Sequence, residues 1–199
     1  GVVNACRRQV QDLKRQKSAD FPYYFDPAAA DRVCRFVELL RNIKGPSAGE
    51  HLRLEPWQCF FITTVFGWKK SENGRRRFNF VYLEIPRGNG KSTLSSAVAL
   101  YMLCADGELS ADVYSFATTR DQARIVFDDA KAMAQQSKQE LADAFGLKIL
   151  NNSLLIPEKN CKFLPKASED STNEGLNSHF ACMDELHAHK TRKLFDVVT

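Results

Sequence analysis

The chain has 199 residues, enough for a sizeable hydrophobic core. Apolar residues make up 44% of the sequence, which excludes a disordered chain, and no apolar run reaches the roughly eighteen residues of a membrane span. The formal net charge of +4 permits contact with nucleic acid without requiring it.

The cysteines are scattered and form no C-x-x-C pair, so metal or redox chemistry is not indicated. We expect reduced, mostly buried thiols in a cytosolic protein. They are Cys6, Cys34, Cys59, Cys104, Cys161 and Cys182.

The first clear element is a helix over residues 27–43. Asp26 can cap its N-terminus, and Pro27 suits the first turn. Apolar side chains recur at helical spacing until Gly45 and Pro46 end the run. A second helix is predicted after Pro56.

The middle of the chain predicts a strand, a glycine loop and a helix in succession. The polar segment 69–77, "KKSENGRRR", should form a loop or hairpin tip. The aromatic and β-branched segment 78–86, "FNFVYLEIP", predicts a buried strand. The segment 92–105, "STLSSAVALYMLCA", continues from the loop as a helix.

The second half repeats this alternation. It predicts a strand in "ADVYSFAT", a helix over 119–137 with a capping threonine, and short strands within 147–167 that turn at 151–152 and near 158–160. An apolar strand, "HFACMDE", ends in two acids. Strands that alternate with helices predict an α/β fold with a mainly parallel sheet flanked by helices.

The loop "EIPRGNGKST" has the parts of a phosphate cradle, since a strand precedes it and a helix N-terminus follows. Gly88 and Gly90 allow a tight curl, Lys91 is placed to reach the β- and γ-phosphates, and Ser92 is placed to bind Mg²⁺. Ile85 stands where such loops usually open with glycine. An ordinary strand-to-helix turn is the alternative interpretation.

Arg87 is unusual inside such a loop. An arginine there could reach the γ-phosphate and neutralise charge that develops in the transition state. The alternative is a surface arginine beside the loop.

The two acids that end the last strand complete a candidate site. Asp184 can hold the Mg²⁺ shell, and Glu185 can orient the attacking water. With the 111–118 strand expected between the loop strand and the acidic strand, this arrangement favours an ATPase over a small kinase. For His187 and His189 a solvated turn or supporting contact is favoured over a metal site.

Five blocks of the sequence, in chain order, resemble the ATPase domain of the bacteriophage terminase large subunit, the motor that packages viral DNA. They are "YYFDPAAADRVCRFVELL", "LRLEPWQCFFITTVFGW", "PRGNGKST", "TTRDQARIVFDDA" and "EGLNSHFACMDELHAHK". The resemblance implies a P-loop NTPase of the ASCE type with an N-terminal helical extension. It also implies ATP hydrolysis with ATP and Mg²⁺ as cofactors.

The resemblance assigns roles to particular residues. Lys91 and Ser92 match Walker A, while Asp184 and Glu185 match Walker B and the catalytic glutamate. The cofactor-binding set implied is Trp57 and Gln58 for adenine, with the loop residues Arg87, Gly88, Asn89, Gly90, Lys91, Ser92 and Thr93. An amide both donates and accepts hydrogen bonds, as the adenine edge requires.

Motors of this kind need an arginine from the neighbouring subunit, which implies a homo-oligomeric ring. Arg120 is the favoured candidate, and Arg124 is the alternative, with a simple solvated helical position as its other interpretation. A neighbouring arginine of this kind is worth roughly 10³–10⁵ in rate.

The family implies partners and a place of action. It implies double-stranded DNA held by its backbone, the portal, the terminase small subunit, no membrane, and the host cytoplasm. The basic segment 69–77 is the densest candidate DNA contact, with a solvated hairpin tip as the alternative.

We expect residues 1–50 to form the helical extension and residues 51–199 the ATPase core. The chain is expected to stop after Walker B, before the family's nuclease domain, so nuclease activity is not expected. Two other functions stay open: a helicase-like nucleic-acid-dependent ATPase, and a non-catalytic module that binds nucleotide or partners.

Overall fold

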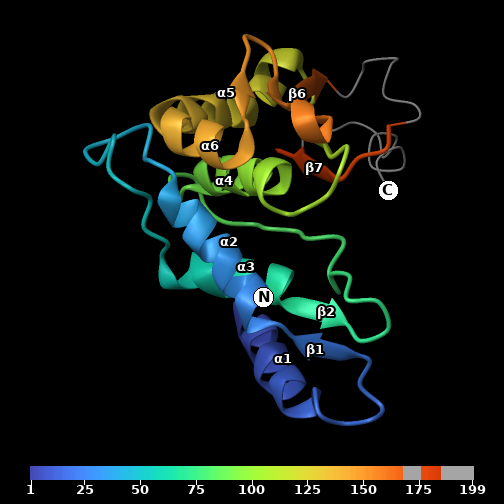
Figure 1. The fold of residues 1–199 in the computed structure, drawn as a ribbon. Helices are drawn as coiled ribbons and strands as arrows, with labels where there is room; N and C mark the ends of the chain where they lie inside the picture. Colours follow the sequence, from blue (N-terminus) through green and yellow to red (C-terminus); the bar gives the residue numbers. More distant parts are fainter. Residues whose placement is uncertain (168–175, 185–199) are drawn as a thin grey trace. The chain divides into compact units, whose positions relative to one another are not determined.

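The computed structural model describes residues 1–167 and 176–184. The chain divides into two compact units, one of Gly1–Glu38 and Arg53–Ile85 and the other of Leu39–Leu52 and Pro86–Thr199. Figure 1 shows the elements of each unit. The expected domain boundary near residue 50 stays a prediction, and these units interleave around it.

The first unit combines helices with one short two-stranded sheet. Strands β1 and β2 pair antiparallel, with Phe25 opposite Trp68. Its elements are α1 (Val2–Arg15), β1 (Tyr23–Phe25), α2 (Pro27–Leu39), α3 (Pro56–Gly67) and β2 (Trp68–Lys70).

The expected cap of α2 is present. Asp26 Oδ1 accepts the Ala29 N–H at 3.0 Å, so the predicted N-terminus of α2 is confirmed. Helix α2 ends at Leu39, earlier than predicted. Leu40, which was assigned to that helix, is fully buried beyond its end.

An aromatic cluster forms part of the core of the first unit. Trp68 is fully buried and meets Phe21 and Phe25 edge-to-face, with ring centroids 6.0 and 5.5 Å apart. The Arg77 guanidinium lies over the Tyr23 ring at 4.3 Å. These contacts pack Phe21 and Arg77 against the short sheet.

The predicted strand over residues 78–86 is wrong. The structure has no strand in this segment, and Phe80 and Tyr82 are 62% and 72% exposed. A strand forms only where neighbouring strands accept and donate its backbone hydrogen bonds, and none of the described strands pairs with this segment.

The second unit is built on a five-stranded sheet of order β4-β5-β6-β3-β7. Its elements are α4 (Lys91–Cys104), β3 (Asp112–Ala117), α5 (Arg120–Gln136), α6 (Lys138–Phe145), β4 (Lys148–Ile149), β5 (Leu154–Ile156), a 3-10 helix (Pro157–Lys159), β6 (Cys161–Ala167) and β7 (Phe180–Met183).

The sheet is mixed, so the expectation of a mainly parallel sheet is corrected. Strands β6, β3 and β7 are parallel, whereas β4, β5 and β6 pair antiparallel. The antiparallel part follows from the predicted turns at 151–152 and near 158–160, because strands joined by tight turns can only pair in that sense.

The expected place of β3 is also corrected. It was predicted between a loop strand and the acidic strand, but its neighbours are β6 and β7. The acidic strand β7 does lie beside β3, with Phe116 opposite Met183. The carboxyl ends of both strands therefore meet at one edge of the sheet.

Helices α4 and α5 pack on the same face of this sheet. Ser115 Oγ on β3 donates to the Ala123 carbonyl of α5 at 2.9 Å, and the rings of Phe127 and Phe163 join α5 to β6 at 5.3 Å. Ser96 Oγ lies 2.8 Å from the Val126 carbonyl, which ties α4 to α5. These buried contacts fix the start of α4 relative to the sheet.

All six cysteines are free. The expectation that most are buried is wrong, because only Cys104 and Cys161 are buried and Cys6 is exposed. Among the described residues, the helices are too short or too polar to cross a membrane.

Candidate nucleotide site

The glycine loop forms a tight turn into α4. Gly88 and Gly90 have φ of +81° and +74°, a region that favours glycine, and Gly90 is the residue that precedes the helix. The Asn89 side chain donates to the Pro86 carbonyl at 3.1 Å, which closes the turn. The loop can therefore curl as a phosphate cradle requires.

The N-terminus of α4 is open to an anion. No side chain in the described part of the chain caps it, and its first turn contains no acidic residue. Backbone N–H groups and the positive end of the helix dipole favour a negative ligand at such a place. Lys91 is the first residue of the helix and adds a full positive charge.

The structure brings the loop and the acidic strand end together. Lys91 Nζ lies 3.2 Å from Asp184 Oδ1, with side chains 38% and 16% exposed. Asp184 follows β7, and its N–H donates to the Phe116 carbonyl at 3.1 Å. The sheet therefore holds the carboxylate beside the start of α4.

The Cys182 thiol interacts with the Ser95 side chain and with the charges of this pair. The pKa of the Cys182 thiol is raised to about 11, chiefly by burial; the hydrogen bond with Ser95 and the charge of Lys91 lower it, and the charge of Asp184 raises it. The thiol is therefore neutral and inert at neutral pH. No sequence motif marks these two residues, so the sequence reasoning missed them.

The donor set suits a magnesium ion carried by a nucleotide. Within the described residues no group of three or more His, Cys, Asp and Glu side chains is arranged to hold a metal ion. Mg²⁺ keeps several waters and is bound through one or two protein oxygens plus substrate phosphates. Asp184 and Ser92, the second residue of α4, match that requirement.

The predicted adenine residues lie on α3, in the first unit. Gln58 is the third residue of α3, and its Oε1 accepts the Glu55 N–H at 2.9 Å as half of a capping box. Trp57 is half-buried. Because these residues belong to a different unit from the loop, their contact with a nucleotide stays a prediction.

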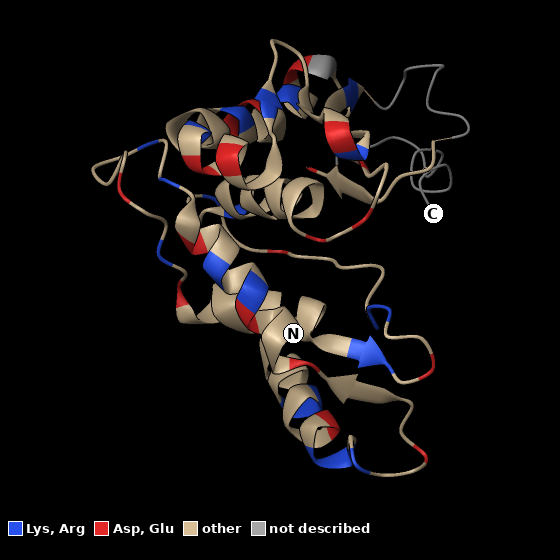
Figure 2. Ribbon diagram, in the orientation of Figure 1, with Lys and Arg blue, Asp and Glu red and all other residues tan. Residues whose placement is uncertain are grey.

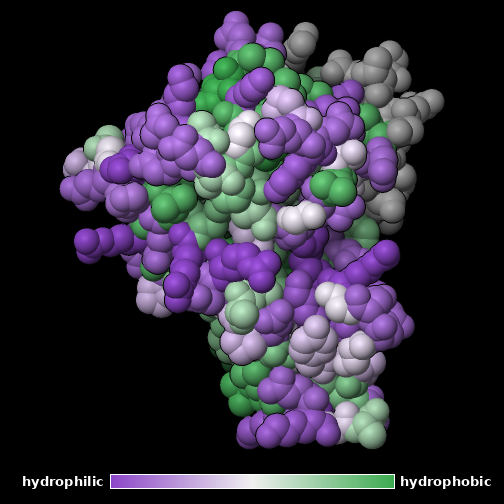
Figure 3. All heavy atoms as spheres, viewed as in Figure 1, coloured by the Kyte–Doolittle hydropathy of each residue, from purple (hydrophilic) through white to green (hydrophobic). Residues whose placement is uncertain are grey.

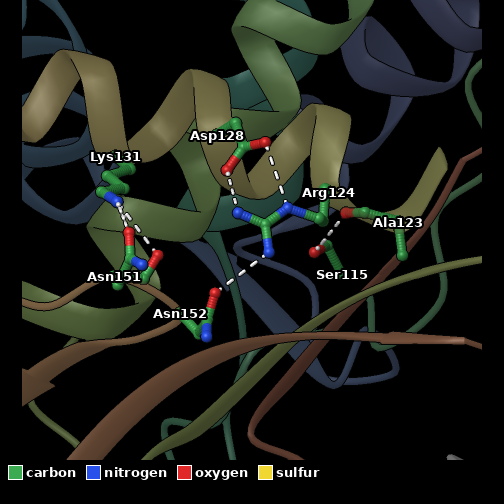
Figure 4. A network of polar contacts seen from close by, with 7 residues as sticks. All are labelled: Ser115, Ala123, Arg124, Asp128, Lys131, Asn151 and Asn152. Atoms are coloured by element: carbon green, nitrogen blue, oxygen red, sulfur yellow. Dashed lines mark hydrogen bonds and ion pairs between the residues drawn. The ribbon is translucent and has the colours of Figure 1, made fainter. Parts of the chain in front are cut away.

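The candidate arginines differ in their surroundings. Arg87 is exposed in the loop. Arg124 contacts Asp128 on its own helix, and its Nη1 donates to Asn152 Oδ1 at 3.0 Å (Figure 4). Lys131 reaches Asn151 beside this network, so the outer side of α5 is tied to the β4–β5 turn. Arg120 is the first residue of α5.

Glu185, His187 and His189 lie outside the described residues. Their roles, with those of Asn89 and Thr93 toward a ligand, stay predictions. The capping role of Gln58 was missed, although a Glu-Pro-x-Gln spacing at a helix start is a signal for it.

Fold and site together define an α/β domain with a mixed sheet flanked by helices and a lysine–aspartate pair beside a glycine loop. Residues 56–199 match the family described as "Terminase large subunit, ATPase domain", and the chain belongs to this family. The resemblance inferred from the five sequence blocks is confirmed.

The fold is also similar to the crystal structure of the HK97 bacteriophage large terminase. The TM-score is 0.62 at 25% sequence identity, and the match covers 77% of this chain. It covers 30% of that terminase chain, so the present chain spans less than a third of its length. A comparison with curated proteins gave no match.

Proposed function

We propose that this chain is the ATP-hydrolysing motor domain of a viral terminase large subunit that drives packaging of double-stranded DNA into a procapsid. The observation that carries the proposal is the 3.2 Å pair of Lys91 and Asp184 at the N-terminus of α4. The family supplies the packaging role and the host cytoplasm as the place of action.

Lys91 and Asp184 would bind different parts of the ligand when ATP enters the site. The Lys91 ammonium would turn from the carboxylate to the β- and γ-phosphates, while Asp184 and Ser92 would hold Mg²⁺. Bound there, Mg²⁺ would neutralise phosphate charge. The carboxylate and the ammonium already lie side by side. Little rearrangement is therefore needed for the ammonium to meet the negative phosphates of ATP and for the carboxylate to meet the positive magnesium ion.

The remaining roles complete the proposed site. Glu185 would orient the attacking water, and Arg87 would stabilise charge on the γ-phosphate. Arg120 would act on a neighbouring subunit of a homo-oligomeric ring on the portal. Trp57 and Gln58 would contact adenine.

The basic turn 69–77 is the proposed contact for the DNA backbone. In Figure 2 the ribbon of β2 and of the segment that follows it is coloured blue, the colour of lysine and arginine residues. Arg77 does not belong to this contact, because Asp12 Oδ2 holds its Nη1 at 2.6 Å inside the first unit. Phosphate contacts of this kind weaken with salt and do not read sequence.

The test is steady-state ATP hydrolysis by the purified chain over a range of protein concentrations, with and without duplex DNA. If a neighbouring subunit supplies the arginine, the rate of ATP hydrolysis should rise more steeply than in proportion to protein concentration. Glu185→Ala should keep nucleotide binding and lose turnover, while the exposed Glu158→Ala should match the parent. Saturable ATP binding without turnover at every concentration would instead define a non-catalytic binding module.

A further inference from the structure

Helix α1 packs on the first unit through polar side chains. Gln9 Oε1 accepts the indole N–H of Trp68 at 2.7 Å, and Asp12 pairs with Arg77 at 2.6 Å. Gln16 Oε1 accepts a main-chain N–H of β1 at 3.1 Å. The inward face of this helix is therefore held by hydrogen bonds and one buried ion pair, not by apolar packing.

The apolar side chains of α1 lie on a different face and are exposed. Val3, Cys6, Val10 and Leu13 follow a three-four-three spacing, which places them in one stripe along the helix. Val3 and Val10 are 62% and 54% exposed, Leu13 is 38% exposed and Cys6 is exposed. We name these four residues the α1 stripe, and Figure 3 shows apolar surface over α1.

One edge of the α1 stripe is positively charged. Arg7 and Lys14 follow Val3 and Val10 by four residues, so they lie beside the stripe, and both are exposed. The only carboxylate of α1, Asp12, is paired with Arg77 on the inward face. An occupant that covers the stripe must therefore bring negative charge to this edge.

We propose that the α1 stripe docks an amphipathic helix of a partner protein whose own apolar stripe is flanked by carboxylates. The three-four-three spacing is that of helix-on-helix packing, and an acidic flank would meet Arg7 and Lys14. This surface is independent of ATP hydrolysis.

The same observations disfavour other occupants. If the α1 helices of two copies of the chain packed stripe against stripe, each cationic edge would face another cationic edge, and the two would repel each other. Duplex DNA would desolvate four apolar side chains without apolar contact in return. The α1 stripe also lacks the aromatic residues typical of helices that bind a membrane surface.

Two synthetic peptides of about eighteen residues, long enough to form helices alone, provide the test. Both carry the same leucine stripe, and one has glutamates and the other lysines at the flanking positions. Fluorescence anisotropy with the complete chain should show micromolar binding of the acidic peptide and at least about tenfold weaker binding of the basic peptide.

Variants locate the surface. Val10→Ser with Leu13→Ser should weaken binding of the acidic peptide by at least about tenfold, whereas Asn4→Ser with Gln11→Ser, away from the stripe, should leave it unchanged. Arg7→Glu with Lys14→Glu should reverse the preference toward the basic peptide. Circular dichroism and thermal unfolding of each variant verify that α1 stays folded.

Alkylation of Cys6 gives an independent readout, because this thiol lies within the α1 stripe. The acidic peptide should slow its modification, measured by mass spectrometry, at least about tenfold at saturation. Equal binding of the two peptides or unprotected Cys6 would overturn the proposal. So would self-association through the stripe, competition by a duplex of about twenty base pairs, or competition by phosphatidylserine vesicles.

Discussion

The ammonium of Lys91 lies 3.2 Å from the carboxylate of Asp184, which joins the start of α4 to the end of β7. A second pair, Lys162 and Asp112, has the same 3.2 Å separation and similar exposure. It lies at the amino ends of strands β3 and β6, whereas Asp184 follows the carboxyl end of β7. The two pairs share their local chemistry and differ in position, so one serves as a control for the other.

Replacing Lys91 should remove nucleotide affinity that replacing Lys162 leaves intact. Lys91→Ala is expected to weaken Mg²⁺-ATP binding by about tenfold to a hundredfold, because a charged hydrogen bond to phosphate is lost at a helix N-terminus. Titration with a fluorescent ATP analogue measures this. Equal affinity in Lys91→Ala and Lys162→Ala would place the nucleotide elsewhere.

Arg87 should act on the reaction more than on binding. If its guanidinium meets charge that grows on the γ-phosphate, Arg87→Ala lowers kcat by about tenfold or more and changes ATP affinity much less. Steady-state kinetics and equilibrium binding separate these effects. Arg32→Ala, an exposed arginine on α2, is the control, and a parental kcat in Arg87→Ala would end this role.

Mixing inactive variants tests the arginine proposed to act on a neighbour. Arg120→Ala keeps its own nucleotide site, and Lys91→Ala keeps its own arginine, so a mixture of the two should regain activity that neither shows alone. A mixture that stays inactive would argue for an arginine acting within its own subunit.

Arg124 provides the comparison for that experiment. Its guanidinium contacts Asp128 and Asn152, so Arg124→Ala should lower stability slightly, by about 1 kcal/mol or less, and keep most of the turnover. If Arg124→Ala loses turnover and mixing with Lys91→Ala restores it, Arg124 is the arginine that acts on the neighbouring subunit.

The ion pair under α1 should contribute strongly to stability. Asp12 and Arg77 are only 7% and 17% exposed, so Asp12→Ala leaves a desolvated guanidinium and should cost about 3 kcal/mol of unfolding free energy. Asp20→Ala, which removes an exposed pair with Arg15, should cost less than about 1 kcal/mol. Urea denaturation compares the two, and equal costs would contradict the buried pair's role.

Buried thiols should make the fold sensitive to alkaline pH. Burial raises the pKa of Cys104 from 9.0 to about 12. Above pH 9 the unfolded chain releases this proton while the folded chain keeps it, so unfolding free energy falls as pH rises toward 12. Cys104→Ala should lose less stability than the parent between about pH 8 and about pH 10.5, measured by urea denaturation. Cys6→Ala, at an exposed thiol, should behave like the parent, and identical losses in all three proteins would refute this cause.

Local signals in the sequence predicted most elements and the central pair. Asp26 and Thr119 mark the starts of α2 and α5, and the side chain of each accepts a backbone N–H there. The glycine loop followed by a helix, and the apolar strand ending in Asp184, predicted the contact with Lys91. These features depend on residues close in sequence, or on the rule that parallel strands end at one edge.

The wrong predictions concern neighbours that the local sequence does not specify. Segment 78–86 has the composition of a buried strand, but composition does not reveal whether two strands will flank it. The pairing of β3 with β6 depends on a strand far along the chain. Helix α1 was not predicted as an element of its own, and polar residues, Gln9 and Asp12, supply its inward contacts.

The most direct measurement is a crystal structure of the chain with Mg²⁺ and a non-hydrolysable ATP analogue. Lys91 is expected to leave Asp184 and to contact the β- and γ-phosphates, while Asp184 lies in the coordination shell of the magnesium ion. A triphosphate bound away from α4, with the 3.2 Å contact of Lys91 and Asp184 intact, would contradict this expectation.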